Sequence, residues 1–208
     1  HLNLGEFSDA ITAANAALAL RPSHADAWCN LASAYWRNHI PDNAIRAARE
    51  ATRYQPKREF FWVVRARIAL SLAYWEEAIA CHEHIFAFHP DDPVHWARAQ
   101  EVRLLAGKAP LCIHEIRQFY RRHPTHPDVR RVLTKALCDL QEFSQAAKLL
   151  ANPRGIPKEL QAEICFRTGQ LQQGKSLLQQ LPTRAKKYVL SLRFLADTSA
   201  WQSLVQHA

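Results

Sequence analysis

The chain has 208 residues, of which 48% are hydrophobic and 22% are charged, and it contains only five glycines. This apolar share is enough to bury a core, and the scarcity of glycine argues against a β-rich or loop-rich fold. Alanine, leucine, glutamine and arginine are abundant. Because all four favour helices, we expect an all-α protein.

The excess of basic over acidic side chains lies wholly in the second half of the chain. Residues 1–92 carry 9 basic and 11 acidic side chains, whereas residues 93–208 carry 18 and 8, which gives the net charge of +8. No apolar run approaches the roughly 18 residues of a membrane span, and no leader peptide is visible at the first residue, His1.

The five cysteines include no C-x-x-C pair, which argues against a disulfide framework and against a zinc site of the usual spacing. We interpret them as free, buried thiols. Unpaired thiols are typical of a reducing compartment, so we expect a cytoplasmic location.

Residues of similar character recur every 34 positions, beginning with Pro22, Pro56, Pro90 and Pro124. Three more series keep this interval: Trp28, Trp62, Trp96 and Arg130; Ala10, Ala44, Ala78, Cys112 and Ala146; and Phe7, Pro41, Trp75, Ala109 and Phe143. Four series in one register indicate a stack of similar supersecondary units.

Each unit is predicted to contain two helices. In residues 25–58, Trp28, Leu31 and Tyr35 fall at helical spacing, and a break follows at residues 39–42. Pro41 suits the first turn of a second helix, where its missing N–H is not needed. The small side chain of Ala44 on that helix allows the two backbones to approach closely.

The unit resembles the tetratricopeptide repeat in the order of its aromatic, small and proline positions, which are Trp28, Leu31, Ala32, Tyr35, Ala44, Ala51 and Pro56. This resemblance implies a right-handed α-solenoid of antiparallel helix pairs, that is, a superhelix. The expected divisions are a partial first unit at residues 1–24, complete units at 25–58, 59–92, 93–126 and 127–154, and degenerate helical units at 155–208, which would cap the array or dock another domain. Since the first unit lacks its first helix, we expect the protein to extend upstream.

The resemblance also implies that the first helix of each pair lines a concave face that binds peptides or scaffolds complexes. In this register the candidate partner-binding residues are cationic, apolar or amide side chains: Asn30, Trp36, Arg37, Phe60, Arg67, Leu70, Arg98, Arg131 and Lys135. Arginines bind carboxylates through two parallel hydrogen bonds. The leading interpretation is therefore a protein-interaction scaffold whose groove binds an acidic and apolar segment. The alternative is that these charges are a solvated helix face.

One family subtype grips a C-terminal carboxylate with Asn and Lys or Arg side chains. Asn30 matches one of its positions, but Phe60 and Val64 stand where the subtype has Lys and Arg. We therefore do not expect that clamp.

Two other functions remain open. The chain could be the repeat region of a larger enzyme, such as a glycosyl- or sulfotransferase. It could also bind nucleic acid or an acidic surface through its basic half, where Phe119 to Arg122 and Lys186 to Tyr188 mix basic and aromatic side chains.

The residues themselves predict neither an enzyme nor a cofactor, because no glycine-rich phosphate loop, GxSxG or HExxH motif occurs. The eleven histidines lie at helix faces or at junctions between units, as His89 and His95 do, and we assign none of them as a metal ligand.

Overall fold

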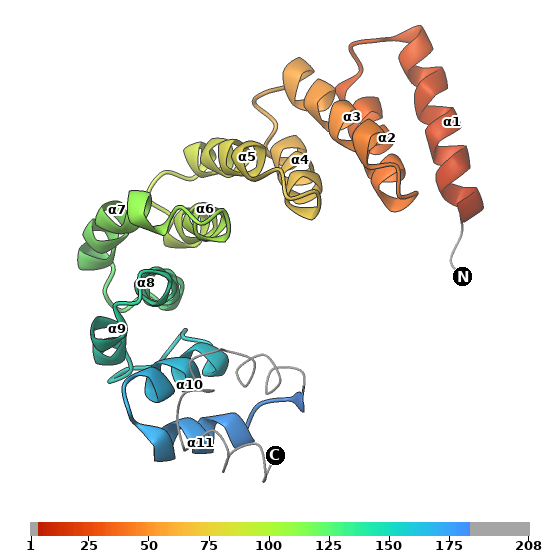
Figure 1. Cartoon of the computed structure of the whole chain (residues 1–208). Coiled ribbons are helices and arrows are strands. Elements are labelled where there is room, and N and C mark those ends of the chain that lie inside the picture. The colour runs from red at the N-terminus through yellow and green to blue at the C-terminus, as the bar shows by residue number, and fades with distance from the viewer. Residues whose placement is uncertain (1–3, 184–208) are drawn as a thin grey trace. The chain divides into compact units, whose positions relative to one another are not determined.

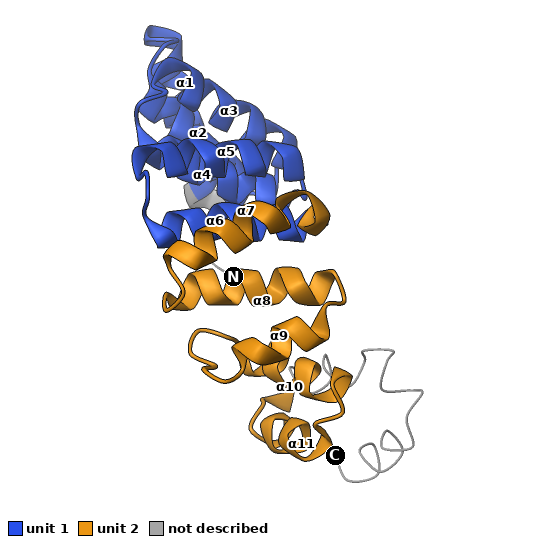
Figure 2. Ribbon diagram, turned by 90° about the vertical axis from the view of Figure 1, so that its left-hand side faces the viewer, with its two compact units in different colours: residues 1–106 blue, residues 107–208 orange. Residues whose placement is uncertain are grey.

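The computed structural model describes residues 4–183, and these residues form eleven α-helices and no strand (Figure 1). The chain divides into two compact units, residues 1–106 and 107–208 (Figure 2). The last part of the degenerate region predicted at 155–208, including the basic cluster at Lys186, Lys187 and Tyr188, lies outside the described residues. None of the described helices has the length and apolarity that crossing a membrane requires.

The first unit consists of six helices that pack in chain order. They are α1 (Leu4–Leu20), α2 (Ala25–Arg37), α3 (Pro41–Tyr54), α4 (Glu59–Ser71), α5 (Trp75–Phe88) and α6 (Pro93–Leu105). Helices α2 and α3 form one antiparallel pair and α4 and α5 the next, while α1 packs on α2 and α6 packs on α5.

The second unit consists of five helices in the described residues, of which the last three are shorter than those of the first unit. They are α7 (Ala109–Arg122), α8 (Pro127–Asp139), α9 (Phe143–Leu149), α10 (Lys158–Arg167) and α11 (Leu171–Gln179), and each packs on the next. The expected all-α class, an α-solenoid of antiparallel helix pairs, is confirmed. The division of the array after residue 154 stays a prediction.

The turn between the helices of a pair is the same in successive repeats. Its central residue has a positive φ at His39 (58°), Ala73 (55°), Gly107 (73°) and Gln141 (61°), positions that are 34 residues apart. The next residue closes the helix end through a backbone bond, as from Tyr74 N–H to the carbonyl of Ala69 (2.9 Å). This is the Schellman arrangement, in which one left-handed residue ends a helix.

The paired tryptophan and proline series has a physical cause. The indole Nε1 of Trp28 donates to the carbonyl of Pro22 (2.8 Å), and that of Trp62 donates to Pro56 (2.7 Å). Arg130 occupies the same repeat position two repeats after Trp62, and its guanidinium donates to the carbonyl of Pro124 (3.3 Å). Each bond ties the first helix of a repeat to the loop that precedes it.

Small residues lie where the helices of a pair cross, as the sequence predicted. Ala32 and Ala44 have no exposed surface, and neither have Ala78 and Ala146 at later copies of the Ala44 position. Methyl groups at these points allow the close approach of two helix backbones, while larger side chains such as Leu31 fill the space around them.

A charged group replaces apolar packing in the second complete repeat. Arg65 stands where the family has leucine, and its Nε donates to Glu77 Oε1 (2.8 Å) on α5. Arg49 on α3 donates to the same carboxylate (2.9 Å), so Glu77 joins three helices. Burial alone would raise the pKa of Glu77, but the two arginines outweigh it and the pKa is lowered.

Candidate functional site

The first unit contains a hollow, here called the basic groove, of about 230 Å³. Helices α4, α5 and α6 provide its lining, which is Glu59, Val63, Ala66, Arg67, Leu70, His82, Ile85, His95 and Arg98. Three of the predicted partner-binding residues, Arg67, Leu70 and Arg98, therefore come together here.

Two arginines of the basic groove lack an acidic partner within the part of the chain that the structure describes. Arg67 and Arg98 are exposed, and neither forms an ion pair with a carboxylate of the described residues. The Arg67 guanidinium instead lies over the Trp36 ring, 5.1 Å from its centroid. The Trp36 indole is itself fixed, because its Nε1 donates to Ser71 Oγ (3.0 Å). Arg67 is thus positioned by an aromatic face while its charge stays available.

The charge of Arg98 also acts on His82, a partly buried residue in the wall of the groove. Burial lowers the pKa of His82, and the nearby charges of Arg98 and His95 lower it further. A positively charged, partly dry surface of this kind favours anionic groups.

Apolar side chains stand next to the basic groove on α4. Phe60 is 59% exposed and Val63, which lines the groove, is 42% exposed, whereas Leu70 is half-buried. Aromatic side chains and arginine are enriched at protein interfaces, and Phe60 and Arg67 both occur on this helix.

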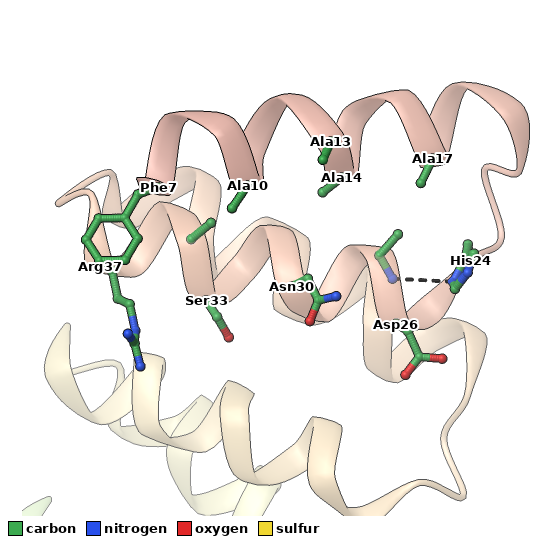
Figure 3. Close-up of a pocket in the computed structure, with 12 residues that line it drawn as sticks. Phe7, Ala10, Ala13, Ala14, Ala17, His24, Asp26, Asn30, Ser33 and Arg37 are labelled. Carbon is green, nitrogen blue, oxygen red and sulfur yellow. Dashed lines mark hydrogen bonds between the residues drawn. The ribbon is translucent and has the colours of Figure 1, made fainter. Parts of the chain in front are cut away.

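Asn30 and Arg37 lie on a second hollow of about 510 Å³, between α1 and α2 (Figure 3). Its wall on α1 is formed by Ala10, Ala13, Ala14 and Ala17. Ala10 is exposed, although the equivalent Ala44 is fully buried. The Arg37 guanidinium lies 5.9 Å from the centroid of the Phe7 ring.

The other two predicted residues, Arg131 and Lys135, belong to the second unit. Arg131 pairs with Asp128 (2.7 Å) and Lys135 pairs with Asp139, and all four residues lie on α8. Their charges are therefore partly neutralised within α8, unlike those of Arg67 and Arg98. Whether any of the nine predicted residues binds a partner stays a prediction.

Two further groups bear on the chemistry of the chain. Glu59, His89 and His95 bring their ligand atoms within 4.8 Å of one another, an arrangement that can hold a metal ion and that our sequence analysis did not anticipate. Phe119, which the sequence placed in a basic and aromatic cluster, is buried and is therefore not available for stacking bases.

The stacked antiparallel pairs define the class of the protein, an α-solenoid. Family models for the TPR repeat match residues 2–38 and those for the tetratricopeptide repeat match residues 25–58. Residues 2–58 therefore contain tetratricopeptide repeats, as the repeat pattern of the sequence indicated. A comparison with curated protein sequences finds no match.

Solved structures with the same fold have little sequence in common with the chain. PilF of Pseudomonas aeruginosa is 18% identical, with a TM-score of 0.57, and the match covers 100% of this chain and 92% of that one. MamA is 14% identical, with a TM-score of 0.56 and coverages of 80% and 87%. YrrB, described as a TPR protein with an unusual peptide-binding site, is 10% identical, with a TM-score of 0.54 and coverages of 86% and 98%. At these identities the likeness concerns the fold alone.

Proposed function

We propose that the chain is a protein-interaction scaffold whose basic groove binds an acidic and apolar segment of another protein. One observation carries this proposal. Arg67 and Arg98 face solvent without carboxylate partners among the described residues, beside the exposed apolar side chains Phe60 and Val63.

The two kinds of side chain would contribute differently to binding. An exposed ion pair contributes about 0–1 kcal/mol, and a charge-assisted hydrogen bond that becomes shielded contributes about 1.5–3 kcal/mol. The arginines would therefore set the orientation and the charge preference of the partner. Most of the affinity would come from covering Phe60, Val63 and Leu70, because a few buried apolar anchors dominate most interfaces.

The relatives support this use of the fold without identifying a partner. The name of the YrrB structure refers to a peptide-binding site in that protein. Another similar structure, with a TM-score of 0.61 at 14% identity, is Naa15/Naa10 bound to HypK-THB. Fold alone does not define function, so the proposal depends on the groove.

The test is selection of peptides from a random display library on the chain, followed by titration of the enriched peptides. We expect enrichment of peptides that combine Asp or Glu with Leu or Phe. Changing Arg67 and Arg98 together to glutamate should weaken their binding at least tenfold, because two attractions become repulsions. Raising the salt concentration should weaken the wild-type complex more than the mutant complex.

The matched control is the double variant Arg21→Glu and Lys57→Glu, which changes the net charge equally at two exposed positions in the turns before α2 and α4. It should bind the peptides nearly as the wild type does. Selection of peptides without acidic residues, or equal affinity for wild type and the Arg67 and Arg98 variant, would contradict the proposal.

A further inference from the structure

Three side chains from successive helices meet at one edge of the first unit. Glu59 begins α4, His89 directly follows the last residue of α5 as its C-cap, and His95 lies in the first turn of α6. Glu59 Oε2 lies 2.8 Å from His89 Nε2, and Glu59 Oε1 lies 3.9 Å from His95 Nε2. The two imidazole rings stack with their centroids 4.1 Å apart and their planes 21° apart.

The hydrogen bond of His95 to Asp92 fixes which of its nitrogens faces Glu59. His95 Nδ1 contacts Asp92 Oδ2, and the same carboxylate group accepts from the backbone N–H of Val94 (3.1 Å), which caps α6. A neutral His95 therefore carries its proton on Nδ1, and its Nε2 presents a lone pair. That lone pair faces the Glu59 carboxylate at a distance too long for a hydrogen bond.

A cation between these groups would resolve an arrangement that is otherwise unfavourable. The Nε2 lone pair of His95 and the Glu59 carboxylate are both electron-rich, so they repel each other unless a proton or a metal ion lies between them. A carboxylate that accepts the other imidazole proton is the arrangement that orients histidine ligands in metal sites, and Asp92 has that position here.

We propose that Glu59, His89 and His95 form a binding site for one Zn²⁺ ion. Two imidazole nitrogens and one carboxylate oxygen are ligands that Zn²⁺ accepts at about 2.0–2.2 Å, with a fourth position left to water or to another ligand. The ligand atoms already lie within 4.8 Å of one another, and none of the three side chains is fully buried, so small rotations bring them to the ion. Mg²⁺ and Ca²⁺ prefer oxygen ligands and should bind far more weakly.

The site would connect three helices of two successive repeats. Glu59 and His95 also line the basic groove, so the ion would lie in its wall. The proposal does not depend on the proposed function, because the chain binds the ion without a partner.

The experiment is calorimetric titration of the untagged full chain with Zn²⁺, repeated with Mg²⁺. We expect one Zn²⁺ per chain and no measurable heat of binding with Mg²⁺. His95→Ala and Glu59→Gln should each lower the affinity for Zn²⁺ at least tenfold. Asp92→Asn keeps a side chain that can cap α6 and should lower the affinity by about ten- to a hundredfold, since it removes only the orienting carboxylate.

The matched control is His114→Ala, which removes an exposed histidine on α7 that is not part of the cluster. This variant should bind Zn²⁺ as the wild type does, and circular dichroism should show equal helicity for all variants. The proposal is overturned if the wild type does not bind Zn²⁺. It is equally overturned if Glu59→Gln and Asp92→Asn, which preserve side-chain shape, bind Zn²⁺ with the wild-type affinity. The same conclusion follows if His114→Ala lowers the affinity for Zn²⁺ as much as the variants of the cluster do.

Discussion

Arg130 shows how one repeat position accepts two very different side chains. Where Trp28 and Trp62 each donate one hydrogen bond to a proline carbonyl, the Arg130 guanidinium donates to the carbonyls of Pro124, Leu149 (2.6 Å) and Asn152. The side chain is buried, so these carbonyls replace the water that a charged group would otherwise need. The position thus requires a long side chain with an N–H donor.

The residue with a positive φ in each turn leads to a prediction about a single substitution. Ala73 has a φ of 55°, is exposed, and has the Cβ that makes this conformation unfavourable. Ala73→Gly should raise the free energy of unfolding by about 0.5–1 kcal/mol, as measured by urea denaturation. Ala80→Gly, an exposed position inside α5, is the control and should lower it by a similar amount. Equal destabilisation by both changes would show that the turn is not strained.

At the scale of helices, Glu77 is the residue that joins α3, α4 and α5 by charge. Glu77→Gln weakens its bonds to Arg49 and Arg65, so we expect the free energy of unfolding at pH 7 to fall by about 1–3 kcal/mol. Glu76→Gln removes the same charge from an exposed neighbour and should have less than half that effect.

We also expect the effect of Glu77→Gln on the free energy of unfolding to depend on pH. The folded pKa of Glu77 lies below its usual value of 4.5. Its contribution to stability is therefore fully present above that value and is lost as the pH falls through the folded pKa. Urea denaturation at pH 7 and at pH 3 should show the difference between wild type and Glu77→Gln shrinking at the lower pH. A difference that is constant with pH would exclude a role for the ionised carboxylate.

How far the sequence predicts each element depends on how strongly its repeat is marked. The tryptophans of the first helices and the prolines in the loops before them locate α2 to α6 well, because backbone sterics and large packed side chains act locally. The pattern weakens after α9, where Pro153, Gly155 and Pro157 interrupt the helices, and α9 itself has only 7 residues.

The candidate site is less predictable than the helices for a physical reason. The basic residues can be read from the sequence, but whether each forms an ion pair depends on which carboxylates lie beside it in the folded chain. Arg131 and Lys135 have such a carboxylate on α8, whereas Arg67 and Arg98 have none among the described residues. The Glu59, His89 and His95 cluster joins residues 30 positions apart. It could have been found by asking which positions the repeat register places at one edge: the start of one first helix, the end of the second helix and the first turn of the next unit.

At the scale of the whole molecule, each of the two units is a stack in which every helix packs on its neighbours in sequence. Stability in such arrays is close to a sum of local terms. Ala44→Leu should overpack the crossing of α2 and α3 by about 1–3 kcal/mol. Hydrogen exchange read by mass spectrometry should show weaker protection in α2 to α5 and unchanged protection in α10 and α11. Ala80→Leu, at an exposed position, is the control and should leave the protection of all these helices unchanged. Loss of protection throughout the chain after Ala44→Leu would mean that the chain unfolds as one cooperative body.

All five cysteines are unpaired and buried, one each on α2, α5, α7, α8 and α10. Burial raises the pKa of Cys29 and Cys81 to about 11 and that of Cys138 to about 12. A thiol that stays protonated and inaccessible reacts slowly with oxidants and disulfides, since the thiolate is the reactive form. The fold therefore protects its five thiols by burying them and not by pairing them.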